Sequence, residues 1–214
     1  MSIAQAFCVS IVLCWLGGTL FPLIIHIWIN DLRPCIPWVS GCIGFLEVGI
    51  SDPGSYFYRG FLIPGSMILM GWYLAMGRWL EALTSDKRSQ WIPWLGMLVS
   101  VCSVAAVSLL RPEMEEIIWP WILGIALALL VTQCILHGLI LSIANRAQVS
   151  PNSLGWTVKN WVFRFQVLLA VILTANYFFD FGGAAALKGM EWWYVAATVL
   201  FFFISYSQWK NYHL

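Results

Sequence analysis

The sequence predicts an all-α membrane protein, a single domain over residues 1–214 in which six transmembrane helices form one bundle. Two observations predict this fold class. Hydrophobic residues make up 61% of the chain and charged residues 10%, with a mean hydropathy of +0.81, whereas soluble domains carry about 25% charged residues. The apolar residues also gather in six runs, each near the roughly 20 residues that a helix needs to cross a bilayer. Because lipid does not tolerate unpaired backbone polar groups, each run is expected to be helical.

The six predicted helices follow these runs in chain order. The first run, residues 7–28, lacks the charged start and the small-residue cleavage site of a signal peptide, so we interpret it as a retained helix. The other helices are expected at residues 61–80, 91–110, 117–143, 161–179 and 192–209. The longest connector, residues 34–59, is expected to form an ordered loop and to hold any functional site.

The distribution of charge predicts the orientation of the bundle. Six spans place both termini on one side of the membrane. The side with the termini carries more basic residues, and the opposite side carries most of the acidic ones. The basic residues on the side with the termini are Arg78, Lys87, Arg88, Arg146, Lys159, Arg164 and Lys210. The positive-inside rule therefore predicts cytoplasmic termini and a lumenal or extracellular loop at residues 34–59.

Several classes of function are disfavoured by composition. A net charge of +1 provides no basic field for nucleic acid. The three histidines, His26, His137 and His213, are predicted on both sides of the membrane and cannot share one ion. We therefore expect neither a metal site nor another cofactor.

Short motifs in and around the first loop resemble the FRAG/DRAM/Sfk family of six-span membrane proteins. They read PWVS at residues 37–40, IG at 43–44 and PGSYFYR at 53–59. The segment with EW at 191–192, LFFF at 200–203, Tyr206 and WK at 209–210 is similar to that family's last helix. The spacing is closest to the branch that remodels the lipid of GPI anchors, the post-GPI-attachment factor branch. Two features depart from the pattern: the interval between Ser40 and Pro53 is longer, and ISD at residues 50–52 imitates the autophagy-modulator branch.

The resemblance implies a protein that acts on or through membrane lipids, in support of GPI-anchor lipid remodelling. It implies an endomembrane location, in the Golgi or endoplasmic reticulum, with the plasma membrane or lysosome as alternatives. Whether such a protein catalyses a reaction or assists another enzyme is left open. The alternative function is a non-enzymatic regulator or scaffold of the autophagy-modulator or phosphoinositide-kinase-anchoring type.

The polar residues expected on the loop side supply the candidate site. His26, Ser40 and Asp52 contain the residue types of an acyl-transfer triad, although no Gly-x-Ser-x-Gly elbow is present. The candidates for lipid binding are Arg59, Glu47, Glu191, Asn176 and His137. Arg59 either binds a lipid phosphate or pairs with Asp52 or Glu191. His137 and Asn176, inside the predicted helices, either line a site or form hydrogen bonds between helices.

Two further features of the sequence concern cross-links and partners. Cys35 and Cys42 share the first loop and could form a disulfide if the loop faces an oxidising compartment. The helix at residues 61–80 carries Gly65 and Gly71 among large side chains. Small residues permit close helix contact, so this helix is expected at the centre of the bundle or against a partner membrane protein.

Overall fold

The computed structural model describes residues 3–29, 36–50, 52–110, 118–147, 154–179 and 183–209. All regular secondary structure in these ranges is helical, which confirms that the fold is all-α. Six helices are long and apolar enough to cross a membrane. They are α1 (Ile3–Ile29), α4 (Gly54–Thr84), α5 (Trp91–Leu109), α6 (Trp119–Arg146), α7 (Leu154–Phe179) and α8 (Ala184–Trp209). Three short helices complete the described chain, namely α2 (Pro37–Ser40), α3 (Phe45–Val48) and the 3-10 helix η1 (Lys87–Gln90).

Three of the long helices begin well before the predicted positions. Helices α4, α7 and α8 start at Gly54, Leu154 and Ala184, whereas the apolar runs begin at residues 61, 161 and 192. The prediction counted apolar residues, and the extra turns carry polar or small ones. The alanines that open α8 have the highest helix propensity of all residues. Consequently Arg59 and Glu191 lie on helices and not at the ends of loops.

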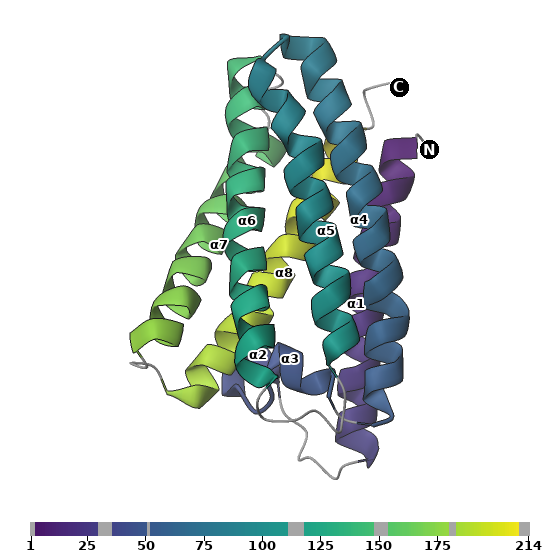
Figure 1. Cartoon of the computed structure of the whole chain (residues 1–214), viewed down its shortest axis with the longest axis vertical. Helices are drawn as coiled ribbons and strands as arrows, with labels where there is room; N and C mark the ends of the chain where they lie inside the picture. Colours follow the sequence, from purple (N-terminus) through teal and green to yellow (C-terminus); the bar gives the residue numbers. More distant parts are fainter. Residues whose placement is uncertain are drawn as a thin grey trace.

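The long helices pack as neighbours in a single bundle (Figure 1). Helix α4 packs against α1 and α5, α6 packs against α5 and α7, and α8 packs against α7 and α1. The first and last helices bring both chain ends to the same end of the bundle as η1, which we call the terminal end. Helices α2 and α3 lie at the opposite end, which we call the loop end.

Small residues on α4 and α5 allow these helices to approach closely. A Cβ atom added to Gly65 would lie 2.8 Å from the Cβ of Cys14 on α1, and one added to Gly77 would lie 2.6 Å from Pro93 on α5. A Cβ atom on Gly96 would collide with Tyr73. Gly65 and Gly77 therefore pack α4 against α1 and α5 of the same chain. Contact of α4 with a partner membrane protein stays a prediction.

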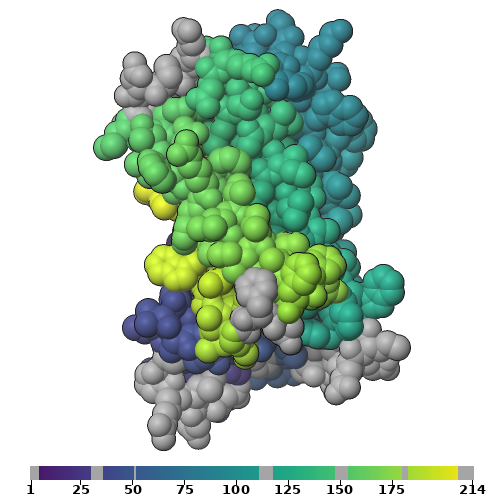
Figure 2. Space-filling view, turned by 90° about the vertical axis from the view of Figure 1, so that its left-hand side faces the viewer, coloured from purple at the N-terminus to yellow at the C-terminus, as the bar shows by residue number. Residues whose placement is uncertain are grey.

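The segment that holds α2 and α3, residues 36–50, is docked on the start of α8. The Trp192 indole donates to the Ile43 carbonyl at 2.9 Å, and the Trp193 indole donates to the Trp38 carbonyl at 3.0 Å. Gly41 turns the chain in the left-handed region, with φ of 56°, and its Cα faces the backbone of Ala185. Figure 2 shows the start of α8 and this segment together at the loop end, beside α7.

Candidate functional site

A cavity of about 300 Å³ lies inside the loop-end half of the bundle. Helices α4 to α8 form its sides, and Phe45 and Leu46 of α3 contribute at the loop end. Its lining runs from Val99 to Leu110 and from Trp119 to Gln133. At 1.5 Å per residue these stretches are about 17 Å and about 21 Å long, close to the roughly 15 Å of hydrocarbon in one leaflet. The lining is mostly apolar, and the cavity is partly open.

Glu191 is the charged residue of the described lining, and it lies at the loop end. One of its carboxylate oxygens, Oε2, accepts a hydrogen bond from the Phe45 backbone N–H at 2.8 Å. The neighbouring Gly44 N–H donates to Oε2 of Glu47 at 2.8 Å, and Oε1 of Glu47 pairs with the Lys188 ammonium at 2.8 Å. Two carboxylates therefore hold the first turn of α3, because backbone N–H groups at a helix start have no partner within the helix.

Two buried donors around Phe45, whose N–H binds Glu191, have no hydrogen-bond partner within the described chain. They are the Tyr58 hydroxyl and the Trp15 indole N–H, and both residues line the cavity. Each contacts Phe45: the Trp15 ring stacks on it with centroids 6.2 Å apart, and the Tyr58 ring lies at 5.5 Å. Buried polar groups nearly always have a hydrogen-bond partner in native proteins, so two such donors without one in the same region indicate a missing partner, such as a ligand.

The inner end of the cavity meets a connected polar network in the terminal-end half. Tyr194 donates from its hydroxyl to Oε1 of Gln133 at 3.1 Å, and both residues line the cavity. Deeper in the bundle, His137 lies 3.2 Å from the Tyr73 hydroxyl and 3.1 Å from Oε1 of Gln166. Nε2 of Gln166 donates to the Thr198 hydroxyl at 2.9 Å.

This network fixes the tautomer of His137. The amide nitrogen of Gln166 donates to Thr198, so the amide oxygen faces Nδ1 of His137, which must carry the proton. Nε2 of the ring then accepts from Tyr73. Phe201 covers one face of the imidazole, stacked with ring centroids 3.8 Å apart. His137 is thus fully enclosed and hydrogen-bonded between helices, as one of its two predicted roles requires.

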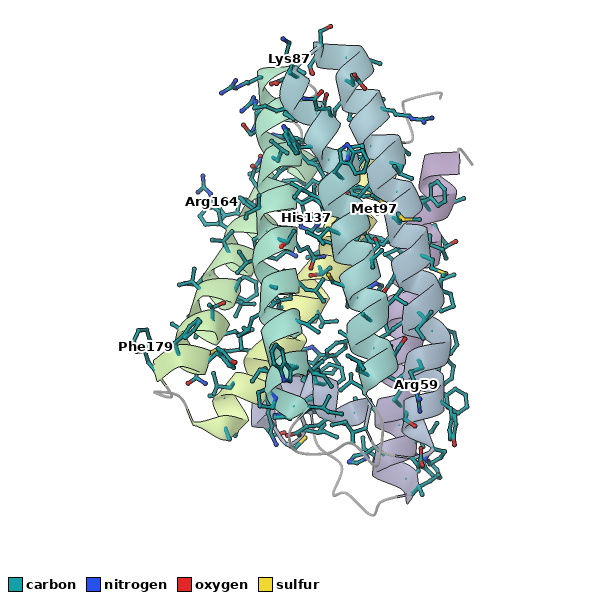
Figure 3. All side chains as sticks on the ribbon, viewed as in Figure 1. Arg59, Lys87, Met97, His137, Arg164 and Phe179 are labelled. Carbon is teal, nitrogen blue, oxygen red and sulfur yellow. The ribbon has the colours of Figure 1, made fainter. Side chains whose placement is uncertain are left out.

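The five predicted lipid-binding residues separate into two groups. Glu191 and Asn176 line the cavity, whereas Arg59, Glu47 and His137 do not. Arg59 lies on the side of α4 away from α6 and α7 (Figure 3), where its guanidinium donates to the backbone carbonyl of Ser55 and to its hydroxyl, each at 3.3 Å. Among the described residues, neither predicted ion pair of Arg59 is formed.

The three candidates for a catalytic triad are not assembled. The Ser40 hydroxyl is exposed and donates to the Ile36 carbonyl at 2.9 Å, and Asp52 accepts from the Ser55 hydroxyl at 2.6 Å. Among the contacts of the described residues, neither of these two side chains hydrogen-bonds to His26. Within the described ranges, no group of His, Cys, Asp or Glu is arranged to hold a metal ion. Cys42 is disulfide-bonded, and its predicted partner Cys35 lies outside the described residues.

Sequence reasoning missed four residues of these two regions. Tyr58 and Trp15 are residue types that usually anchor a protein at the membrane interface, and only their contact with Phe45 distinguishes them. Gln166 lies within the apolar run at residues 161–179 and was not singled out there. Lys159 was counted among the connector charges, but it lies on α7 with 2% of its surface exposed and its ammonium 4.6 Å from the Phe201 ring centroid.

The function must be argued from this geometry. No protein-family model matches the chain, and no curated protein or solved structure matches it.

Proposed function

We propose that this chain is a membrane protein that binds a lipid, with one acyl chain held in the cavity between α4 and α8. The observation that carries the proposal is the shape and lining of that cavity: it is mostly apolar, partly open, about one leaflet deep, and polar at the loop end. Its volume of about 300 Å³ is at the small end of the roughly 300–1,000 Å³ typical of ligand pockets. It therefore suits one chain, with the remainder of the lipid in the bilayer.

The energetics place selectivity at the polar end of the cavity. An acyl chain gains little hydrophobic free energy on moving from bilayer to protein, because lipid tails are as apolar as the lining. Discrimination between lipids must come from shape and from polar contacts. The loop end offers these at Glu191, Tyr58 and Trp15.

The lining favours binding over acyl transfer. Its described residues include no Cys, His or Lys, and the hydroxyl of Ser66, one of its two serines, is bonded to the Leu62 carbonyl at 2.8 Å. An activated nucleophile needs an adjacent base. A protein that holds or presents a lipid needs only the cavity.

The narrower proposal follows from the resemblance of the first loop to the GPI-remodelling branch. The charge distribution supports cytoplasmic termini, so the loop end of the cavity would open to the lumenal leaflet of an endomembrane. GPI anchors occupy that leaflet, with their acyl chains in the bilayer. The chain would then support remodelling by holding one such acyl chain.

The test is a comparison of lipids retained by three purified proteins. Ala126→Trp places a large side chain in the cavity wall, and Val131→Trp places the same side chain on an exposed position of α6. Native mass spectrometry should detect a defined lipid on the wild type and on Val131→Trp, and none on Ala126→Trp. If Ala126→Trp retains the same lipid, the cavity is not the site. The regulator or scaffold function would then be favoured.

A further inference from the structure

The charges around the cavity restrict the polar end of its ligand. Glu191 is an acid, and the described lining contains no Lys, Arg or His. The nearest basic side chain on the same helix, Lys188, is already paired with Glu47 at 2.8 Å. A phosphate or carboxylate held beside Glu191 would meet a like charge, because the one ammonium nearby in the described chain, Lys188, already faces the two carboxylates of Glu47 and Glu191. Burial strengthens that repulsion.

The two donors that have no partner in the described chain restrict the polar end of the ligand further. Tyr58 and Trp15 need an acceptor, since an indole N–H can only donate and a phenol hydroxyl is commonly a donor when buried. The carboxylate of Glu191 accepts from backbone N–H groups at the start of α3 and has further lone pairs that can accept from a ligand donor. An ammonium has donors only, and a phosphate dianion has acceptors only. A hydroxyl group supplies both.

We propose that the polar end of the ligand is an uncharged hydroxyl-bearing group, as in a monoacylglycerol or another long-chain alcohol. The ligand hydroxyl donates to Glu191 and accepts from Tyr58 or Trp15, while the chain runs toward Gln133. This inference rests on the proposed lipid-binding function. It adds the chemical class of the ligand, and it disfavours the narrower GPI-anchor proposal, because the lipid of a GPI anchor carries a phosphate at its polar end.

The experiment is a competition assay on the protein in phosphatidylcholine nanodiscs, with radiolabelled monopalmitoylglycerol as the probe. The competitors share one chain length and differ in the polar end: monopalmitoylglycerol, hexadecanol, palmitate and hexadecylamine. At about pH 9 palmitate is ionised and the amine is still protonated. Unlabelled monopalmitoylglycerol and hexadecanol should displace the probe. Palmitate and hexadecylamine should be at least about tenfold weaker.

Three variants assign this selectivity to side chains. Glu191→Gln keeps an oxygen that can accept from Phe45 but removes the charge, so competition by palmitate should improve about tenfold. Tyr58→Phe removes one hydrogen bond and should weaken monopalmitoylglycerol about threefold to tenfold. Tyr56→Phe is the matched control, because Tyr56 is on the same helix and is exposed; it should leave binding unchanged.

The outcomes separate this inference from the proposed function. If palmitate or hexadecylamine competes as well as monopalmitoylglycerol, or if Glu191→Gln leaves the order of competitors unchanged, the inference about the polar end is wrong. The cavity proposal would survive that result if Ala126→Trp still abolished probe binding. If the probe binds Ala126→Trp as it binds the wild type, both proposals fail.

Discussion

Gly41 is the residue whose substitution most directly tests how the loop end is built. Its backbone is left-handed, with φ of 56° and ψ of 31°, and a Cβ atom there would overlap the backbone carbonyl of Ala185. Gly41→Ala is therefore expected to lift α2 away from α8. A non-glycine residue in this conformation costs about 1–2 kcal/mol, and the colliding atoms belong to a helix backbone that cannot rotate aside.

The magnitude follows from the contacts that would be lost. Lifting α2 strains the bonds from Trp192 to Ile43 and from Trp193 to Trp38, each worth a net contribution of about 0.5–1.5 kcal/mol. Together with the backbone term, the expected loss is about 3 kcal/mol. For a chain of this size, about 2–4 °C per kcal/mol gives a fall in Tm of about 6–12 °C.

The assay is thermal unfolding of the purified protein in detergent, followed by tryptophan fluorescence. Gly124→Ala is the matched control, because a Cβ atom there meets nothing within 4 Å. That residue lies inside α6, where alanine is better than glycine by about 0.5–1 kcal/mol, so Gly124→Ala should raise Tm slightly. The same substitution thus has opposite signs at two positions. If Gly41→Ala unfolds at or above the wild-type temperature, the docking of α2 on α8 has been misjudged.

Three further predictions concern other parts of the molecule. Gln166→Leu leaves Nδ1 of His137 without its acceptor and Thr198 without a donor, so Tm should fall by the equivalent of about 1–3 kcal/mol; an unchanged Tm would contradict the network. When the denatured, unreduced protein is alkylated and analysed by mass spectrometry, four of its six cysteines should be modified, namely Cys8, Cys14, Cys102 and Cys134. Hydrogen bonds from Arg88 hold the pKa of Asp86 at about 2, below its usual value of about 3.9. The stability that these hydrogen bonds contribute is present above about pH 3.9 and is lost as the pH falls through about 2. An NMR titration of the Asp86 carboxyl with a midpoint near 4 would refute this prediction.

The number and order of the long helices could be predicted because the bilayer sets their length and requires apolar residues. Their starts could not, because a helix continues past the apolar run wherever the next residues pack. Ser55 and Arg59 lie in the first turns of α4 through this effect. Glu191 likewise lies within α8, on a turn that faces α3.

The cavity could not be predicted from the sequence. It depends on how α4 to α8 are spaced and on α3 returning to the loop end of the bundle, and neither is a local property. Glu191 and Asn176 were found because polar residues near or within a membrane span are conspicuous. Tyr58 and Trp15 were missed because aromatic residues at such positions are ordinary interface anchors. Arg59 was conspicuous for the same reason as Glu191, but the helical phase of α4 turns it away from the cavity.

The state of the polar groups distinguishes the two halves of the bundle. In the terminal-end half, the ring nitrogens of His137 both have partners, and so do the amide groups of Gln166. A satisfied buried network makes a core rigid and leaves nothing for a ligand to bind. At the loop end, the Tyr58 hydroxyl and the Trp15 indole N–H are buried and have no hydrogen-bond partner among the described residues. His137→Leu should therefore lower Tm and leave the order of competing lipids unchanged, whereas Tyr58→Phe should change lipid binding with little effect on Tm. The reverse pattern would move the binding site to the histidine network.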